Sequence, residues 1–394
     1  MNDWAVIIVI YLAIFISSPL IAILHELGHA FAYLILTKPD KIDIYIGSYV
    51  FEKNAIQFKT GKIHFYIKRS FPFIKGIGLC RSSKPESNYL KYVVILLAGS
   101  FFTFLAAGVF ALIAFNTQAN LLLQIACYIF LGLSALSLLA NLVPREISKS
   151  YTDNLDSDGK QLLLALNIKK ARPAYIEALQ DIRKKEYDSA ILKLKNVLTI
   201  APHNQDVLRL LIVTSLNGKR YDETANALVE LESTSKLSPD IMFYKGCLQS
   251  SKLQHDEAIA TYSEVIKKDK NNVLALNNIG YELIEKGAHQ VAKRALDRAI
   301  KLNPKFDYPY SNLGYSKIVQ GEIAEGKTLI DKCLSLNINN ADAYKALAVY
   351  YLKLKDVNQA KINIDKATEL DADTDLVVYD KELKLLQDQI GSQD

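Results

Sequence analysis

Three long stretches of nearly uncharged, apolar residues dominate the first 145 positions of the chain. The first has no charged residue from Trp4 to Leu24, a run of 21 residues. Because about 20 apolar residues of helix cross the hydrocarbon core of a bilayer, each stretch is long enough to span a membrane. A cleavable signal peptide explains the first stretch poorly, since no basic residue precedes it and an h-region has only about 7–15 residues. The pattern predicts spans at about residues 4–36, 89–115 and 121–143.

The link at 116–120 is too short to be anything but a turn, so the second and third spans should form an antiparallel hairpin. Gly99, Gly108 and Gly132 lie within these two spans. Small side chains let membrane helices approach each other closely. Glycine is also frequent in membrane helices in general, so both interpretations stay open.

Residues 38–88, between the first two spans, contain runs in which apolar and polar side chains alternate. The clearest runs are 41–46 and 62–67. Alternation with a period of two is typical of β-strands, so we expect a small sheet against the membrane face. The segment holds ten Lys or Arg against four Asp or Glu, whereas the 116–120 link holds no charge. The positive-inside rule then places residues 38–88 and everything after the third span in the cytoplasm, with the N-terminus outside.

From Pro173 onward, three series of residues recur every 34 positions. A period of this length indicates stacked helical repeats, in which recurring small side chains let paired helices pack closely. The pattern resembles tetratricopeptide repeats, which implies an α-solenoid over residues 173–394 with a concave groove for protein or peptide and a capping helix at 374–390. The series are Ala190, Thr224, Ala258, Ala292, Gly326 and Ala360; Ala178, Ile212, Gly246, Gly280, Gly314 and Ala348; and Val197, Leu231, Val265, Ala299, Cys333 and Ala367.

The composition argues against nucleic-acid binding and against sites built from cysteines. The net charge of +5 is spread along the chain, which argues against nucleic-acid binding. The four cysteines are far apart and form no CxxC pair, so the sequence predicts neither a disulfide framework nor a thiolate zinc site.

The end of the first span carries the motif His25-Glu26-Leu27-Gly28-His29. Two histidines four residues apart project from one face of a helix and can bind a single metal ion, while the glutamate beside them can move a proton. This is the HExxH arrangement of zinc hydrolases. The alternative is a helix end that merely reaches water at the membrane surface. Ionisable groups at membrane depth are rare and usually functional, which favours the metal site.

A catalytic zinc site generally needs a third protein ligand and an open position for water. His64 is one candidate, although its alternating run is more typical of a half-exposed surface histidine. Asp153, Asp156 and Asp158 are better candidates, because they lie in a loop just past the third span.

The first 165 residues or so resemble the site-2 protease family of intramembrane zinc metalloproteases. The resemblance rests on the histidine motif, on Ala98-Gly99-Ser100 in the second span, and on Asn141-Leu142-Val143-Pro144 followed by Asp158-Gly159. It implies that Asp158 is the third zinc ligand and that Asn141 positions the substrate strand. Two features depart from the family: it usually has Gly-Pro in place of Gly99-Ser100, and its interval between the proline and the aspartate is commonly shorter.

The fold expected from the sequence is mainly α. A three-helix transmembrane metalloprotease core with a small β-sheet insertion covers residues 1–165, and a tetratricopeptide α-solenoid covers 173–394. We expect a multi-pass protein of the cell membrane with the repeat domain in the cytoplasm.

By resemblance, the expected activity is that of a Zn²⁺ endopeptidase that hydrolyses a peptide bond in or near the membrane. His25, His29 and Asp158 would bind the metal, and Glu26 would be the catalytic base. The expected partners are a membrane protein or peptide substrate, a protein bound in the repeat groove, and the lipid bilayer. The alternative is a membrane-anchored repeat scaffold with an inactive metal site.

Overall fold

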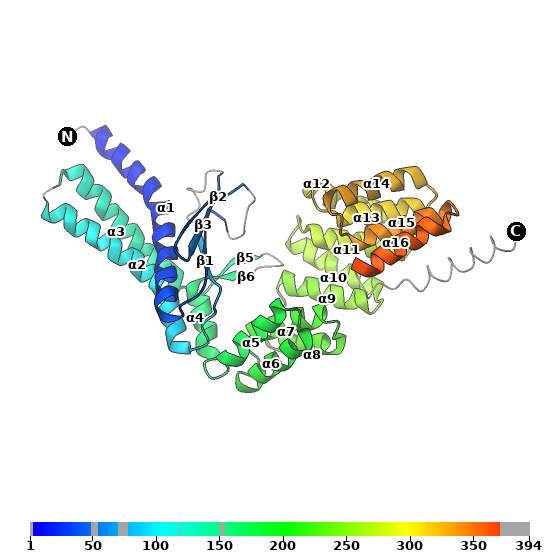
Figure 1. The fold of residues 1–394 in the computed structure, drawn as a ribbon, viewed down its shortest axis with the longest axis horizontal. Coiled ribbons are helices and arrows are strands. Elements are labelled where there is room, and N and C mark those ends of the chain that lie inside the picture. Colours follow the sequence, from blue (N-terminus) through cyan, green and yellow to red (C-terminus); the bar gives the residue numbers. More distant parts are fainter. Residues whose placement is uncertain (1–2, 49–53, 70–77, 118, 150–153, 371–394) are drawn as a thin grey trace. The chain divides into compact units, whose positions relative to one another are not determined.

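The computed structural model describes residues 3–48, 54–69, 78–117, 119–149 and 154–370 (Figure 1). This part of the chain is mainly helical, with one four-stranded and one two-stranded sheet. The chain divides into two compact units, Met1–Gly218 and Lys219–Asp394. The boundary lies within the predicted repeat region, so the first helices of that region belong to the same unit as the apolar helices.

Three long helices carry the apolar stretches: α1 (Asp3–Leu36), α2 (Tyr89–Asn116) and α3 (Leu121–Leu142). Their bounds follow the predicted spans closely, and each helix is long and apolar enough to cross a membrane. Asn88 and Asn120 begin α2 and α3, since each side chain accepts a hydrogen bond from a first-turn N–H. Many apolar side chains of these helices are exposed, such as Leu105 and Leu139 at 62% and 64%.

α1 and α2 cross closely at two glycines. A methyl group on Gly28 would lie 2.5 Å from the Ala98 carbonyl oxygen, and one on Gly99 would lie 2.9 Å from the α1 backbone. Carbon atoms pack at about 3.5–4.0 Å, so a larger residue at either position would force the helices apart. Gly108 and Gly132 have open space where a side chain would begin, among the described residues. The close-packing interpretation is therefore confirmed for Gly99 and wrong for Gly108 and Gly132.

The larger sheet contains β1 (Ile42–Ile46), β2 (Ile56–Thr60), β3 (Ile63–Ile67) and β4 (Gly78–Ser82). The strand order is β2-β3-β1-β4, with β1 parallel to β3 and the other neighbours antiparallel. Ile42, Ile44 and Phe65 on one face pack against Ala30 of α1, and Figure 1 shows the sheet beside that helix. The two predicted strands are confirmed as β1 and β3, whereas β2 and β4 were not predicted.

A short hairpin and a helix follow α3: β5 (Glu146–Lys149), β6 (Asn154–Asp156) and α4 (Asp158–Asn167). β5 and β6 pair antiparallel. The expectation of a loop is therefore wrong for the last two aspartates, because Asp156 ends a strand and Asp158 begins a helix.

The remaining described helices follow one another along the repeat region as helix pairs. In the first unit they are α5 (Arg172–Arg183), α6 (Tyr187–Ile200) and α7 (Gln205–Asn217). In the second unit they are α8 (Tyr221–Thr234), α9 (Pro239–Ser251), α10 (His255–Lys268), α11 (Val273–Glu285), α12 (His289–Leu302), α13 (Tyr308–Val319), α14 (Ile323–Leu336), α15 (Ala341–Lys353) and α16 (Val357–Leu370).

Every member of the three 34-residue series is buried. The glycines of the second series, each in the first helix of a pair, face a large side chain in the second helix. A methyl group on Gly246 would lie 2.5 Å from the Tyr262 ring, and one on Gly280 would lie 2.5 Å from Leu296. The predicted α-solenoid is confirmed by these contacts over the described residues, and the capping helix at 374–390 lies outside them.

Candidate metal centre

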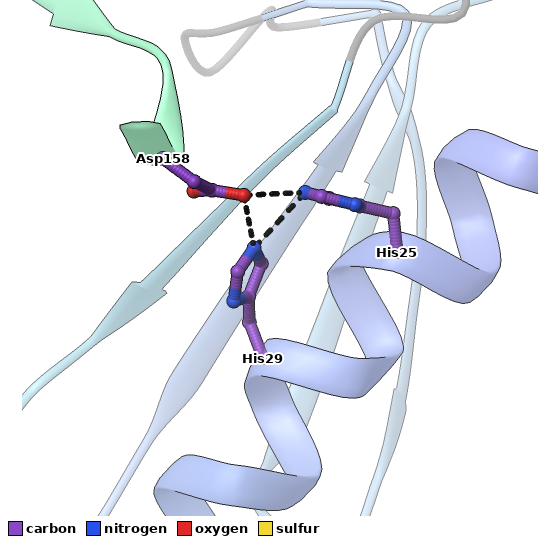
Figure 2. Close-up of side chains that lie close together, drawn as sticks. All are labelled: His25, His29 and Asp158. Carbon is purple, nitrogen blue, oxygen red and sulfur yellow. Dashed lines mark hydrogen bonds and ion pairs between the residues drawn. The ribbon is translucent and has the colours of Figure 1, made fainter. Parts of the chain in front are cut away.

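His25 and His29 lie one helical turn apart on the same face of α1 (Figure 2). Their Nε2 atoms are 3.0 Å apart, and the two rings meet nearly at right angles, with an interplanar angle of 84°. His29 is buried, with 7% of its surface exposed. Both Nε2 atoms therefore point towards one small region beside the helix.

Asp158, the first residue of α4, reaches the same region. Its Oδ2 atom lies 3.2 Å from His25 Nε2 and 3.5 Å from His29 Nε2, and Figure 2 shows the three side chains converging. The structure thus brings together, from two helices far apart in the sequence, the three residues that the sequence singles out as metal ligands.

The other candidates do not join this group among the described residues. Asp156 forms an ion pair with Lys160 at 3.0 Å, and His64 lies on β3. Asp153 lies outside the described residues. Asn141, the predicted substrate-positioning residue, is near the end of α3, where its amide donates to a serine of the same helix at 3.3 Å.

Ser157 fixes the start of the helix that carries Asp158. Its hydroxyl donates to the Val143 carbonyl at 2.8 Å and accepts from the Arg145 N–H at 3.0 Å. It also accepts from the Lys160 N–H at 3.3 Å, as an N-cap does. One buried hydroxyl therefore joins the end of α3 to the beginning of α4.

Gly159 allows this junction to be close. A methyl group there would lie 2.1 Å from the Leu142 carbonyl oxygen. The structure therefore explains why a glycine follows Asp158. Only a residue without a side chain lets the first turn of α4 pack against the end of α3.

α2 packs against the two imidazoles. The His29 Nδ1–H donates to the Ile95 carbonyl oxygen at 2.7 Å, and Ser100 Oγ lies 3.5 Å from His25 Nδ1. A methyl group on Gly99 would come within 2.5 Å of His29 Nε2. Sequence reasoning missed Ile95, because any residue can supply a carbonyl acceptor.

Glu26 is buried beside the histidines and lies against β4. Its exposed fraction is 6%, and a methyl group on Gly78 would be 2.6 Å from its Oε1 atom. The Cys80 backbone N–H donates to the Glu26 carboxylate. β4, which the sequence did not predict, therefore holds Glu26, the proposed base.

The electrostatics of the centre depend on burial and on the neighbouring charges. Burial alone would raise the pKa of Asp158, but His29 and His25 outweigh it and hold this pKa well below the ordinary value. The carboxylate is therefore ionised at neutral pH. Burial, and then the charge of Glu26, raise the pKa of the Cys80 thiol well above its ordinary value, so Cys80 stays protonated.

The three ligand atoms have the spacing of a tetrahedral zinc site. Bonds of about 2.0–2.1 Å place the ligand atoms of such a site about 3.3–3.4 Å apart, and the separations here are 3.0, 3.2 and 3.5 Å. His29 Nδ1 faces a carbonyl and must carry the proton, so Nε2 presents a lone pair. Asp158 Oδ2 is buried and receives no hydrogen bond of standard geometry from the described residues. These residues fit a zinc ion.

The family comparison concerns the repeats. The Tetratricopeptide repeat family model matches residues 273–306 and 341–374. A curated relative, the BBSome complex member BBS4 homolog of Drosophila melanogaster, is 28% identical over 143 residues, which are 36% of this chain. The match spans 29% of that relative's length.

Solved structures with similar helices share little sequence with this chain. PilW, a type IV pilus biogenesis factor, is 16% identical with a TM-score of 0.44, and covers 55% of this chain and 98% of its own. YrrB, a TPR protein with an unusual peptide-binding site, is 15% identical with a TM-score of 0.33, and covers 48% and 97%. The family match identifies residues 273–306 and 341–374 as tetratricopeptide repeats.

Proposed function

We propose that this chain is an intramembrane zinc endopeptidase whose cytoplasmic repeats bind the substrate or a partner protein. The convergence of His25, His29 and Asp158 at tetrahedral spacing carries the proposal. Glu26 lies beside them, so the group has the parts of a HExxH hydrolase.

Each side chain has a role in the proposed reaction. The two imidazoles and the carboxylate would hold zinc, which would make a water molecule acidic near pH 7 and polarise the scissile carbonyl. Glu26 takes a proton from the attacking water and passes it to the leaving amide nitrogen. The hydrogen bond from the Cys80 N–H keeps the Glu26 carboxylate in place for both transfers.

A substrate strand can bind along β4. The Ser83 N–H donates towards β1, so in this antiparallel pair the backbone groups of Gly78, Cys80 and Ser82 point to the opposite edge, where the Cys80 N–H already donates to Glu26. No described strand pairs with β4 there. An extended peptide added to this edge would pass Glu26. A helical substrate must therefore unwind locally before it is cut, and Asn141 is the proposed positioning residue for it.

The membrane supplies the setting for this chemistry. α1, α2 and α3 would cross the bilayer, with their exposed apolar side chains against lipid. The basic segment at 38–88 would lie in the cytoplasm, which puts the metal centre near the cytoplasmic end of α1. Tetratricopeptide repeats suggest protein binding, so the repeat region would recruit the substrate or a partner.

A substitution of Glu26 tests the proposal. Glu26→Gln should retain about one zinc per chain and abolish cleavage, because the metal ligands stay while the base is lost. His25→Ala should lose the metal. Membrane peptides that accumulate in cells with wild-type protein should be absent with Glu26→Gln. Lys59→Gln, on an exposed position of β2 at the sheet edge opposite β4, is the control and should cleave normally. Processing by Glu26→Gln would contradict the mechanism.

A scaffold without enzymatic activity is the competing proposal. The family match to the repeats supports it, and so does Ser100, which replaces the proline usual in the resembled family. Zinc content of the purified full-length protein discriminates the two, since a scaffold with an inactive site should hold no stoichiometric metal that His25→Ala removes.

A further inference from the structure

The two histidines of the centre differ in how their second ring nitrogen is held. In a metal site, one ring nitrogen binds the metal and the other donates a hydrogen bond that fixes the tautomer and the ring orientation. For His29 the acceptor is the Ile95 backbone carbonyl at 2.7 Å. For His25 the group that faces Nδ1 is Ser100 Oγ at 3.5 Å. One imidazole is therefore held by a backbone carbonyl, and the other faces a side-chain hydroxyl.

Ser100 is held firmly in this position. Its exposed fraction is 3%, and it follows Gly99, where α1 and α2 pack closely. Because the backbones at Gly28 and Gly99 are in close contact, the Ser100 backbone is held close to α1. The distance from Ser100 Oγ to His25 Nδ1 is longer than the roughly 2.7–3.2 Å of an ordinary N–H···O hydrogen bond, and hydrogen bonds of catalytic groups are often long in the free enzyme and tighten when substrate binds.

We propose that Ser100 is a positioning residue for His25. Its hydroxyl oxygen accepts the Nδ1–H hydrogen bond, which keeps the Nε2 lone pair aimed at the metal beside Asp158 Oδ2 and His29 Nε2. The inference rests on the proposed metal site and deepens it. Loss of such an outer partner typically weakens metal binding about 10–100-fold.

An isosteric pair of substitutions isolates the hydroxyl from the shape of the side chain. Ser100→Thr keeps the oxygen, whereas Ser100→Val replaces it with a methyl group of similar size. The zinc dissociation constant of the full-length protein in detergent would be measured by competition with a chelator. Ser100→Thr should bind zinc nearly as wild type does, and Ser100→Val about 10–100-fold more weakly.

Ser134→Ala provides a matched control. Ser134 is a buried serine of α3, 1% exposed, and its hydroxyl has no hydrogen-bond partner among the described residues. Its removal should leave the zinc dissociation constant unchanged. A second readout uses Co²⁺ in place of zinc, because its visible absorption reports ligand geometry rather than global stability. The absorption bands should shift in Ser100→Val and not in Ser100→Thr or Ser134→Ala.

Two results would overturn the inference while leaving the metal site intact. One is equal zinc affinity in Ser100→Thr and Ser100→Val, and the other is a loss in Ser134→Ala as large as in Ser100→Val. A wild-type protein without stoichiometric zinc, or a His25→Ala variant that keeps it, would instead overturn the metal site itself. The two failures are therefore distinguishable.

Discussion

Replacing Gly159 with alanine should move Asp158 away from the histidines by a distance that the structure defines. The added methyl group would lie 2.1 Å from the Leu142 carbonyl oxygen. Ordinary contact requires about 3.5 Å, so the first turn of α4 must retreat by about 1.4 Å. The opposing atom belongs to the backbone of α3, which cannot rotate away as a flexible side chain would.

A shift of this size exceeds what a metal site tolerates. Ligand distances in such sites hold to within about 0.2 Å, and a misplacement of about 1 Å can cost about 10²-fold in rate. The overpacking itself costs about 1–3 kcal/mol of stability, partly offset by about 1 kcal/mol because alanine favours helix over glycine. The zinc affinity should therefore fall strongly, whereas the free energy of unfolding should change little.

The assay is zinc content and chelator competition on the full-length protein in detergent, beside a thermal unfolding curve. Gly108→Ala is the control, because it adds the same methyl group to an apolar helix where no described atom lies near. Gly108→Ala should keep wild-type zinc affinity. Wild-type zinc affinity in Gly159→Ala would refute the placement of Asp158, and with it the proposed third ligand.

Two substitutions and one alkylation measurement test the repeats. Gly246→Ala places a methyl group 2.5 Å from the Tyr262 ring and should lower the free energy of unfolding by about 1–3 kcal/mol; an unchanged denaturant midpoint would contradict this packing. Hydrogen bonds from Lys193 and then Ser189 lower the pKa of Asp181. Asp181→Asn should therefore be less stable than wild type at neutral pH, and the difference should narrow as the pH falls below about 4; a pH-independent difference in unfolding temperature would argue against the ion pair. Burial raises the pKa of Cys247 to about 11, so its alkylation at pH 8, followed by mass spectrometry, should be about 10²-fold slower in the folded than in the denatured protein; equal rates would show that the thiol is not buried.

Features that depend on local periodicity could be predicted from the sequence. The three apolar helices follow from uninterrupted hydrophobic runs, and His25 and His29 share a face because of the helical repeat. The solenoid follows from residues that recur every 34 positions, since each repeat buries the same positions against its neighbour. In all these cases the signal lies within one element or in its regular repetition.

β4 could not be predicted because its role depends on contacts distant in the sequence. The strand Gly78–Ser82 is short, lacks a clear alternation and pairs with β1 across more than thirty residues of chain. Its glycine and its backbone N–H matter only because Glu26 lies against them. Every residue except proline has a backbone N–H, so the sequence does not show which N–H contacts Glu26.

The choice among the three aspartates also required three-dimensional information. Spacing alone does not separate Asp156 from Asp158, which differ by two residues. Asp158 enters the centre because Ser157 caps α4 and Gly159 fits against α3, while Tyr92 of α2 donates to Gln161 at 2.8 Å. Packing against the apolar helices α2 and α3 therefore orients α4, and its first residue faces the histidines as a consequence.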